Sequence, residues 1–124
     1  MGQVYRLETA NGTIVADHVE VADTLWSRFM GLMFRRELPP GHGLAIRPCN
    51  SIHMFFMRFA LDVVFVDADG RVVRVLDSIR PWRASTLVRG AKAAIELPAG
   101  TAARSVLVPG MVLRMVENPA PAES

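Results

Sequence analysis

The chain has 124 residues, 51% of them hydrophobic, and 14 basic side chains stand against 12 acidic ones. This length suits one domain, which we expect to span residues 1–117, with residues 118–124 as a disordered tail. No apolar run reaches the roughly 18 residues that a membrane-spanning helix needs, so we expect no membrane partner. A net charge of +2 is a weak bias, and it disfavours a nucleic-acid-binding function.

The N-terminal segment and the cysteine count both bear on the compartment. The stretch "MGQVYRLETANG" lacks the basic and apolar regions of an export signal. The single cysteine, Cys49, cannot form an internal disulfide, which fits a reducing compartment. We therefore expect a cytoplasmic protein.

The first predicted element is a β-hairpin. Side chains alternate over Val4–Thr9, and Asn11-Gly12 then supplies a dipeptide in which both residues tolerate positive φ. This pattern predicts that Val4–Thr9 pairs with Thr13–Ala16. Val19–Val21 would extend or replace the returning strand.

A short helix is predicted next, over Thr24–Met30. Asp23 and Thr24 offer an N-cap, and Gly31 is a suitable stop. The helix would be apolar on more than half of its circumference, so we expect it to cover an open edge or end of a sheet.

The middle of the chain is the most apolar part. Leu44–Ile46 predicts a brief strand inside a turn-rich connector. Over Ile52–Phe59 and Leu61–Val66, apolar residues occupy both alternations, which predicts strands that lie between two layers.

The remaining elements follow clear turn signals. Asp67-Ala68-Asp69-Gly70 joins two β-branched runs and predicts a hairpin. Beyond it we expect a basic loop over Ser78–Gly90, a strand in "AAIELPAG", a short helix or turn in "TAARSVL" and a last strand in "GMVLRMV". The sequence therefore predicts a mainly β domain, a sandwich or partly closed barrel with one or two short helices.

Three stretches occur in a characteristic order: "RFMGLMFRREL", "HMFFMRFALDVVFVDADGRVVRV" and "AIELPAGTAARSVLVPG". The chain from about Val19 to Val116 thereby resembles a bacterial and archaeal family known as domain of unknown function 192. The resemblance implies a compact β-rich sandwich or barrel-like fold and no established activity. The matching positions are Arg28, Gly31, Leu32, Met33, Met57, Asp62, Asp67, Gly70, Glu96, Leu97 and Gly100.

The chain departs from this family in two respects. Many relatives have Trp-Met-Lys-Asn-Thr where this chain has Phe56-Met57-Arg58-Phe59, so no role of the Asn-Thr pair is carried over. Many relatives also begin with an export signal, so the resemblance does not settle the compartment.

Two carboxylates interrupt apolar strands and define the candidate site. Asp62 lies between Leu61 and Val63, and Glu96 between Ile95 and Leu97. A buried carboxylate must be paired or protonated, and we expect arginine partners.

The two arginines that lead as partners are Arg28 and Arg58, and the set has two interpretations. The favoured one is a buried ion pair that fixes strand register. In the functional one, Arg28, His53, Arg58, Asp62 and Glu96 bind a small polar or anionic ligand, with Arg80, Trp82 and Arg83 as a loop rim.

Metal and thiol chemistry are disfavoured. Cys49 and His53 are four residues apart, which is about 13 Å in an extended segment. With His18 and His42 they show no paired zinc spacing. We therefore expect no metal and no cofactor, and interpret Arg35, Arg36 and Arg47 as a solvated basic face.

Three function classes stay open. The leading one is a non-catalytic module that binds a small ligand or a partner. One alternative is a hydrolase or lyase using His53 with Asp62 or Glu96 as acid and base. The other is a protein-interaction domain with an apolar patch near Trp82 or Met33-Phe34. The oligomeric state is not predicted.

Overall fold

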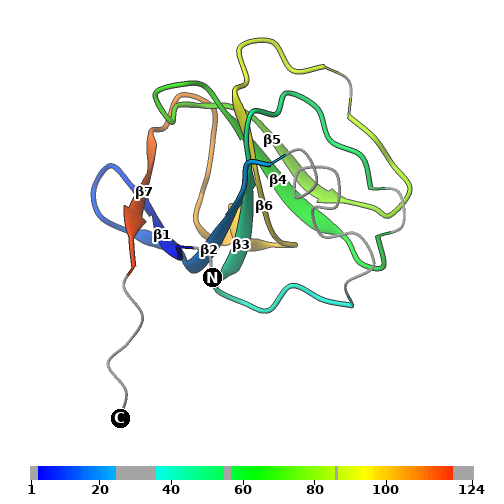
Figure 1. Cartoon of the computed structure of the whole chain (residues 1–124), viewed down its shortest axis with the longest axis horizontal. Coiled ribbons are helices and arrows are strands. Elements are labelled where there is room, and N and C mark those ends of the chain that lie inside the picture. Colours follow the sequence, from blue (N-terminus) through cyan, green and yellow to red (C-terminus); the bar gives the residue numbers. More distant parts are fainter. Residues whose placement is uncertain (1–2, 25–35, 55–56, 86, 119–124) are drawn as a thin grey trace.

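The computed structural model describes residues 3–24, 36–54, 57–85 and 87–118. These residues form a curled sheet and one short helix (Figure 1). The elements in chain order are β1 (Tyr5–Thr9), β2 (Ile14–Ala22), β3 (His42–Ile46), β4 (Leu61–Val66), β5 (Val72–Ile79), β6 (Ala93–Pro98), α2 (Thr101–Arg104) and β7 (Leu113–Glu117).

The strands form one sheet in the order β5-β4-β6-β3-β2-β1-β7. The β2–β3 pair is parallel, and the other neighbouring pairs are antiparallel. The curl brings the edge strands β5 and β7 together at one end, where the backbones of Arg71 and Val112 form an isolated antiparallel β-bridge. There the Leu113 N–H donates to the Gly70 carbonyl at 2.8 Å. The predicted mainly β fold, a partly closed barrel, is confirmed.

Each face of the sheet carries its own core. One core, which we call the inner core, draws residues from all seven strands and therefore fills the concave side of the barrel. The outer core lies on the other face of β3, β4 and β6. The fully buried Leu7 and Val64 belong to the inner core, and the fully buried Val63 and Phe65 to the outer core.

The strand predicted over Leu61–Val66 is confirmed, and all six residues of β4 are buried. The strand predicted over Ile52–Phe59 is wrong within the described residues, where only His53 makes a single bridge, to Ala84. The Met54 N–H donates to the Arg83 carbonyl, and the Ser85 N–H donates to the Ile52 carbonyl. The described residues of this segment are apolar at both alternations because they pack as an irregular layer between a loop and the outer core.

The other predicted elements have different outcomes. The two hairpins, the brief strand in β3, the β6 strand, the short helix α2 and the last strand are confirmed. The predicted helix over Thr24–Met30 falls almost wholly outside the described residues, as does the tail after Asn118. No helix in the described ranges is long and apolar enough to span a membrane.

Candidate ligand site at the mouth of the barrel

Asp62 is fully buried in β4, and both of its carboxylate oxygens accept hydrogen bonds. The Ser78 N–H donates to Oδ1 at 2.8 Å, and the Ala102 N–H donates to Oδ2 at 2.8 Å. Ser78 belongs to a bulge in β5, where the register shifts opposite Asp62, and it has a φ of 51°. The partners of Asp62 are thus backbone amides and not the arginine side chain that we expected.

The two contacts give Asp62 a structural role. Gly100, the N-cap of α2, makes no side-chain capping bond, so Asp62 supplies from β4 the acceptor that the first turn of a helix needs. The same carboxylate satisfies an amide that the β5 bulge removes from strand pairing. Asp62 therefore ties β4 to β5 and to α2.

Glu96 lies on the opposite face of the sheet from Asp62. Glu96 pairs with Leu44 and Val63, which belong to the outer core. Asp62 pairs with Leu97, which belongs to the inner core. Directly paired residues share a face of a sheet, so the two carboxylates do not converge as the functional interpretation required.

The other predicted site residues are dispersed. His53 is half-buried in the layer over the outer core, and Arg58 is exposed. Arg28 falls outside the described residues. The three rim residues Arg80, Trp82 and Arg83 are exposed.

Parallel pairing of β2 with β3 places two histidines side by side, although their spacing in the sequence did not indicate a contact. His18 pairs with His42, and their ring centroids are 4.3 Å apart. The Cys49 thiol lies elsewhere and donates to the Ser51 carbonyl at 2.9 Å. Within the described part of the chain, no group of three or more His, Cys, Asp or Glu side chains is placed to hold a metal ion.

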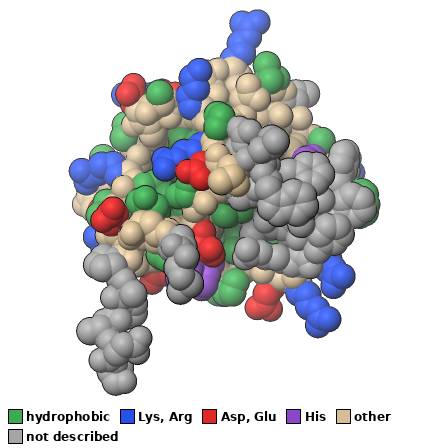
Figure 2. All heavy atoms as spheres, in the orientation of Figure 1, with side chains coloured by type: hydrophobic (Ala, Val, Ile, Leu, Met, Phe, Trp, Pro, Cys, Tyr) green, Lys and Arg blue, Asp and Glu red, His purple; other side chains and the backbone are tan. Residues whose placement is uncertain are grey.

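A cavity of about 470 Å³ opens at the mouth of the barrel, at the end away from α2. Its apolar wall includes Leu7, Ile95, Leu113 and Met115. In the space-filling view the surface is hollowed here, and hydrophobic side chains are visible beside basic and acidic groups (Figure 2).

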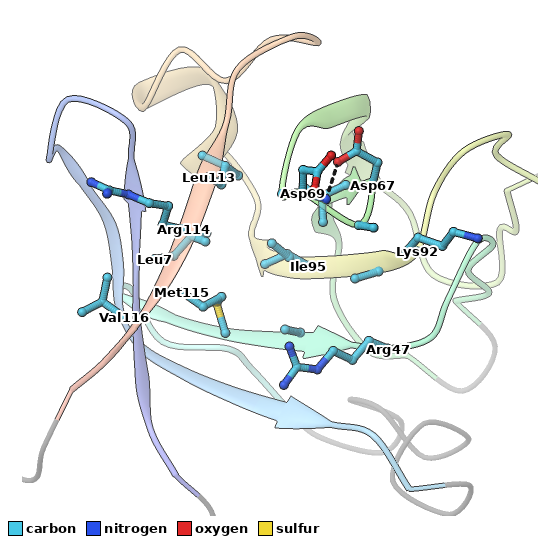
Figure 3. A pocket seen from close by; sticks show the side chains of 15 residues that line it. Leu7, Arg47, Asp67, Asp69, Lys92, Ile95, Leu113, Arg114, Met115 and Val116 are labelled. Atoms are coloured by element: carbon cyan, nitrogen blue, oxygen red, sulfur yellow. Dashed lines mark hydrogen bonds between the residues drawn. The ribbon is translucent and has the colours of Figure 1, made fainter.

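Charged side chains of both signs surround the cavity. Arg47, directly after β3, turns its guanidinium back toward Met115, whereas Lys92 and Arg114 extend away (Figure 3). On the other side lie Asp67 and Asp69. Asp67 Oδ1 accepts the N–H groups of Asp69 and Arg71 at 2.9 Å each, so this carboxylate also holds the β4–β5 turn.

The fold and this cavity define a class: a small, partly closed β-barrel with a ligand-sized opening at one end. The model of the family DUF192, described as "Uncharacterized ACR, COG1430", matches residues 6–115. The chain belongs to this family.

Curated relatives match much of this chain, and a solved structure shares its fold. A UPF0127 protein of Thermococcus sibiricus is 38% identical over 102 residues, which are 76% of this chain and 63% of that protein. A UPF0127 protein of Pyrococcus furiosus is 37% identical over 101 residues, 76% of this chain and 83% of that protein. A crystallised protein of unknown function from Novosphingobium aromaticivorans has a TM-score of 0.76 at 25% identity, covering 90% of this chain and 83% of its own.

Proposed function

We propose that this domain is a non-catalytic binding module, cytoplasmic as the single cysteine suggests, for a small ligand with an apolar body and one anionic group. The observation that carries the proposal is the mouth cavity, which combines an apolar wall with the inward-turned guanidinium of Arg47. Its volume of about 470 Å³ falls in the range of roughly 300–1,000 Å³ that is usual for small-molecule sites.

The chemistry of the wall sets the kind of ligand. Leu7, Ile95 and Leu113 favour an apolar body, because the area buried against them is removed from water. Arginine suits a carboxylate because its planar fork matches the two oxygens. Asp67 and Asp69 on the other side repel additional negative charge, so a monoanion fits better than a polyanion.

The enzyme alternative has less support. The pair His53 and Asp62 is split between the outer layer and the inner core, and both oxygens of Asp62 already accept backbone amides. His53 and Glu96 share a side of the sheet, but neither lines the mouth cavity. We therefore do not propose an acid–base mechanism.

Octanoate is a suitable probe, because it has an apolar chain and a single carboxylate. We expect it to shift the amide signals of cavity residues in heteronuclear NMR titrations. Ala93→Phe should abolish this response, because Ala93 lines the cavity and packs against the inner core. The matched control is Ala103→Phe, on the exposed side of α2, and it should bind octanoate as the parent protein does.

The charge is tested separately from the cavity. Arg47→Gln should weaken octanoate binding about threefold to fivefold, a modest loss because this side chain is exposed. Binding of octanamide should be unaffected by the same substitution. If octanoate causes no saturable shifts, or if Ala93→Phe binds it normally, the proposed function is wrong.

A further inference from the structure

Among the described residues, one edge of β7 has no partner strand beyond Leu113, and it borders the cavity. In an antiparallel pair, the N–H and C=O groups of successive residues point alternately toward the partner and away from it. The Asn118 N–H donates to the Val4 carbonyl, on the β1 side, whereas the Leu113 N–H donates to Gly70, on the other side. By this alternation Met115 and Glu117 direct their backbone groups away from β1.

This edge is open along the cavity. The contact of β7 with the opposite side of the barrel ends at Leu113, because the chain at Asp67–Gly70 turns back into β4. Beyond that point, no strand in the described ranges pairs with β7 on its free side. Met115 and the residues next to it line the cavity, so the gap in the barrel wall and the cavity are one feature.

Three kinds of group therefore face a ligand together: β7 backbone groups that no described strand pairs with, the apolar wall and the Arg47 guanidinium. An aliphatic acid uses the second and third and leaves the strand amides without partners. An extended peptide uses all of them, because it pairs with a free edge and sends alternate side chains to each face.

We propose that the ligand of the mouth cavity is the carboxyl-terminal end of an extended peptide. This inference rests on the proposed function and specifies its ligand. The peptide backbone adds to β7 at Met115, an apolar side chain enters between Ile95 and Leu113, and the terminal carboxylate meets Arg47. Because the open edge is short, two or three peptide residues make the contacts.

The probe is acetyl-Gly-Leu-Val with a free carboxylate, compared with its carboxamide and with a version methylated at the leucine and valine nitrogens. Titrations of the full chain follow the Met115 amide by NMR, with octanoate as a parallel arm. We expect the free acid to bind more tightly than the other two peptides, by about fivefold to tenfold for the loss of each hydrogen-bonding feature. The Met115 amide proton should shift as a newly formed hydrogen bond requires.

Two substitutions test the edge from the protein side. Met115→Pro removes the N–H that faces the gap, and it leaves the β1–β7 hydrogen bonds in place because that N–H does not point to β1. Met115→Ala is its matched control, since it loses the same side chain and keeps the N–H. The peptide should bind Met115→Pro less tightly than Met115→Ala, and octanoate should bind both equally.

The outcomes separate this inference from the proposed function. If octanoate binds at the cavity while N-methylation of the peptide has no effect on its affinity, the peptide inference is overturned and the small-ligand module stands. If neither octanoate nor the peptide binds, both are overturned. Arg89→Gln, an exposed arginine that does not line the cavity, controls for a general effect of charge on peptide binding.

Discussion

The single side chain of Asp62 joins three elements of the fold, β4, β5 and α2. Its carboxylate accepts hydrogen bonds from the backbone N–H groups of Ser78 and Ala102, so each oxygen has a partner within the protein. Asp62→Asn replaces one acceptor oxygen with an NH₂ group that faces another donor. We expect it to lower the free energy of unfolding by about 1.5–3 kcal/mol, and Asp62→Ala by roughly 3–5 kcal/mol.

Urea denaturation measures both effects. Asp77→Asn is the control, because Asp77 is an exposed carboxylate in the same part of β5, and it should change stability by less than about 0.5 kcal/mol. Equal stabilities for Asp62→Asn and Asp77→Asn would contradict the structural role of Asp62.

The burial of Asp62 and Glu96 could be predicted from the sequence, but the groups that surround them could not. An isolated acid between apolar neighbours in a strand indicates burial, and both Asp62 and Glu96 are buried. The partners of Asp62 are backbone N–H groups, which every residue type except proline carries, so no side-chain pattern marks them. The separation of Asp62 and Glu96 follows from the β4–β6 register, which depends on the tertiary structure.

At the scale of the elements, the β4–β5 turn contacts the opposite edge of the sheet at Gly70. Gly70 has a φ of +81°, and a Cβ there would lie 2.3 Å from the Leu113 carbonyl oxygen. Gly70→Ala should therefore displace β7 and cost about 3 kcal/mol or more. Gly12→Ala is a matched control, since Gly12 has a φ of +89° but an added Cβ would meet nothing within 4 Å.

The comparison separates the steric contact at Gly70 from the backbone strain that an alanine would have at either position. Gly12→Ala should cost only about 1 kcal/mol, the usual penalty for a side chain in the left-handed region. Thermal unfolding followed by circular dichroism gives both values. A smaller loss for Gly70→Ala than for Gly12→Ala would show that the edge contact contributes nothing.

The described residues of the segment 52–59 show where local patterns mislead. Apolar residues at both alternations indicate burial on two sides, and that part of the prediction holds for Ile52, Met54 and Met57. The pattern does not distinguish a strand between two sheets from a loop between a sheet and another loop, because both bury both sides. Hydrogen bonds of Ile52 and Met54 with residues 82–85 decide between the two structures here, and they depend on residues distant in sequence.

At the scale of the whole molecule, one sheet separates two cores and supports both. Phe65 of the outer core and Leu7 of the inner core are each fully buried. Phe65→Ala should cost about 3–5 kcal/mol and Leu7→Ala about 2–5 kcal/mol. Both variants should unfold in one transition, because β4 and β6 contribute to the two cores at once.

Unfolding curves followed by tryptophan fluorescence and by far-ultraviolet circular dichroism test this expectation, and the two curves should coincide. Two resolved transitions in either variant would contradict both this mutual support and the expectation of a single domain.

The mouth cavity also forms only at the scale of the whole molecule. Its lining comes from β1, β3, β4, β6 and β7. Arg47 is indistinguishable in the sequence from an ordinary exposed arginine.

The pairing of β1 with β7 also constrains how the protein is made. The register joins Tyr5 to Glu117, so this pair forms only after almost the entire described chain has left the ribosome. Until then β1 is an exposed sheet edge, and the inner core lacks Leu113. Contacts of such long sequence separation slow folding, so the nascent chain is vulnerable to misassociation until β7 has emerged and paired with β1.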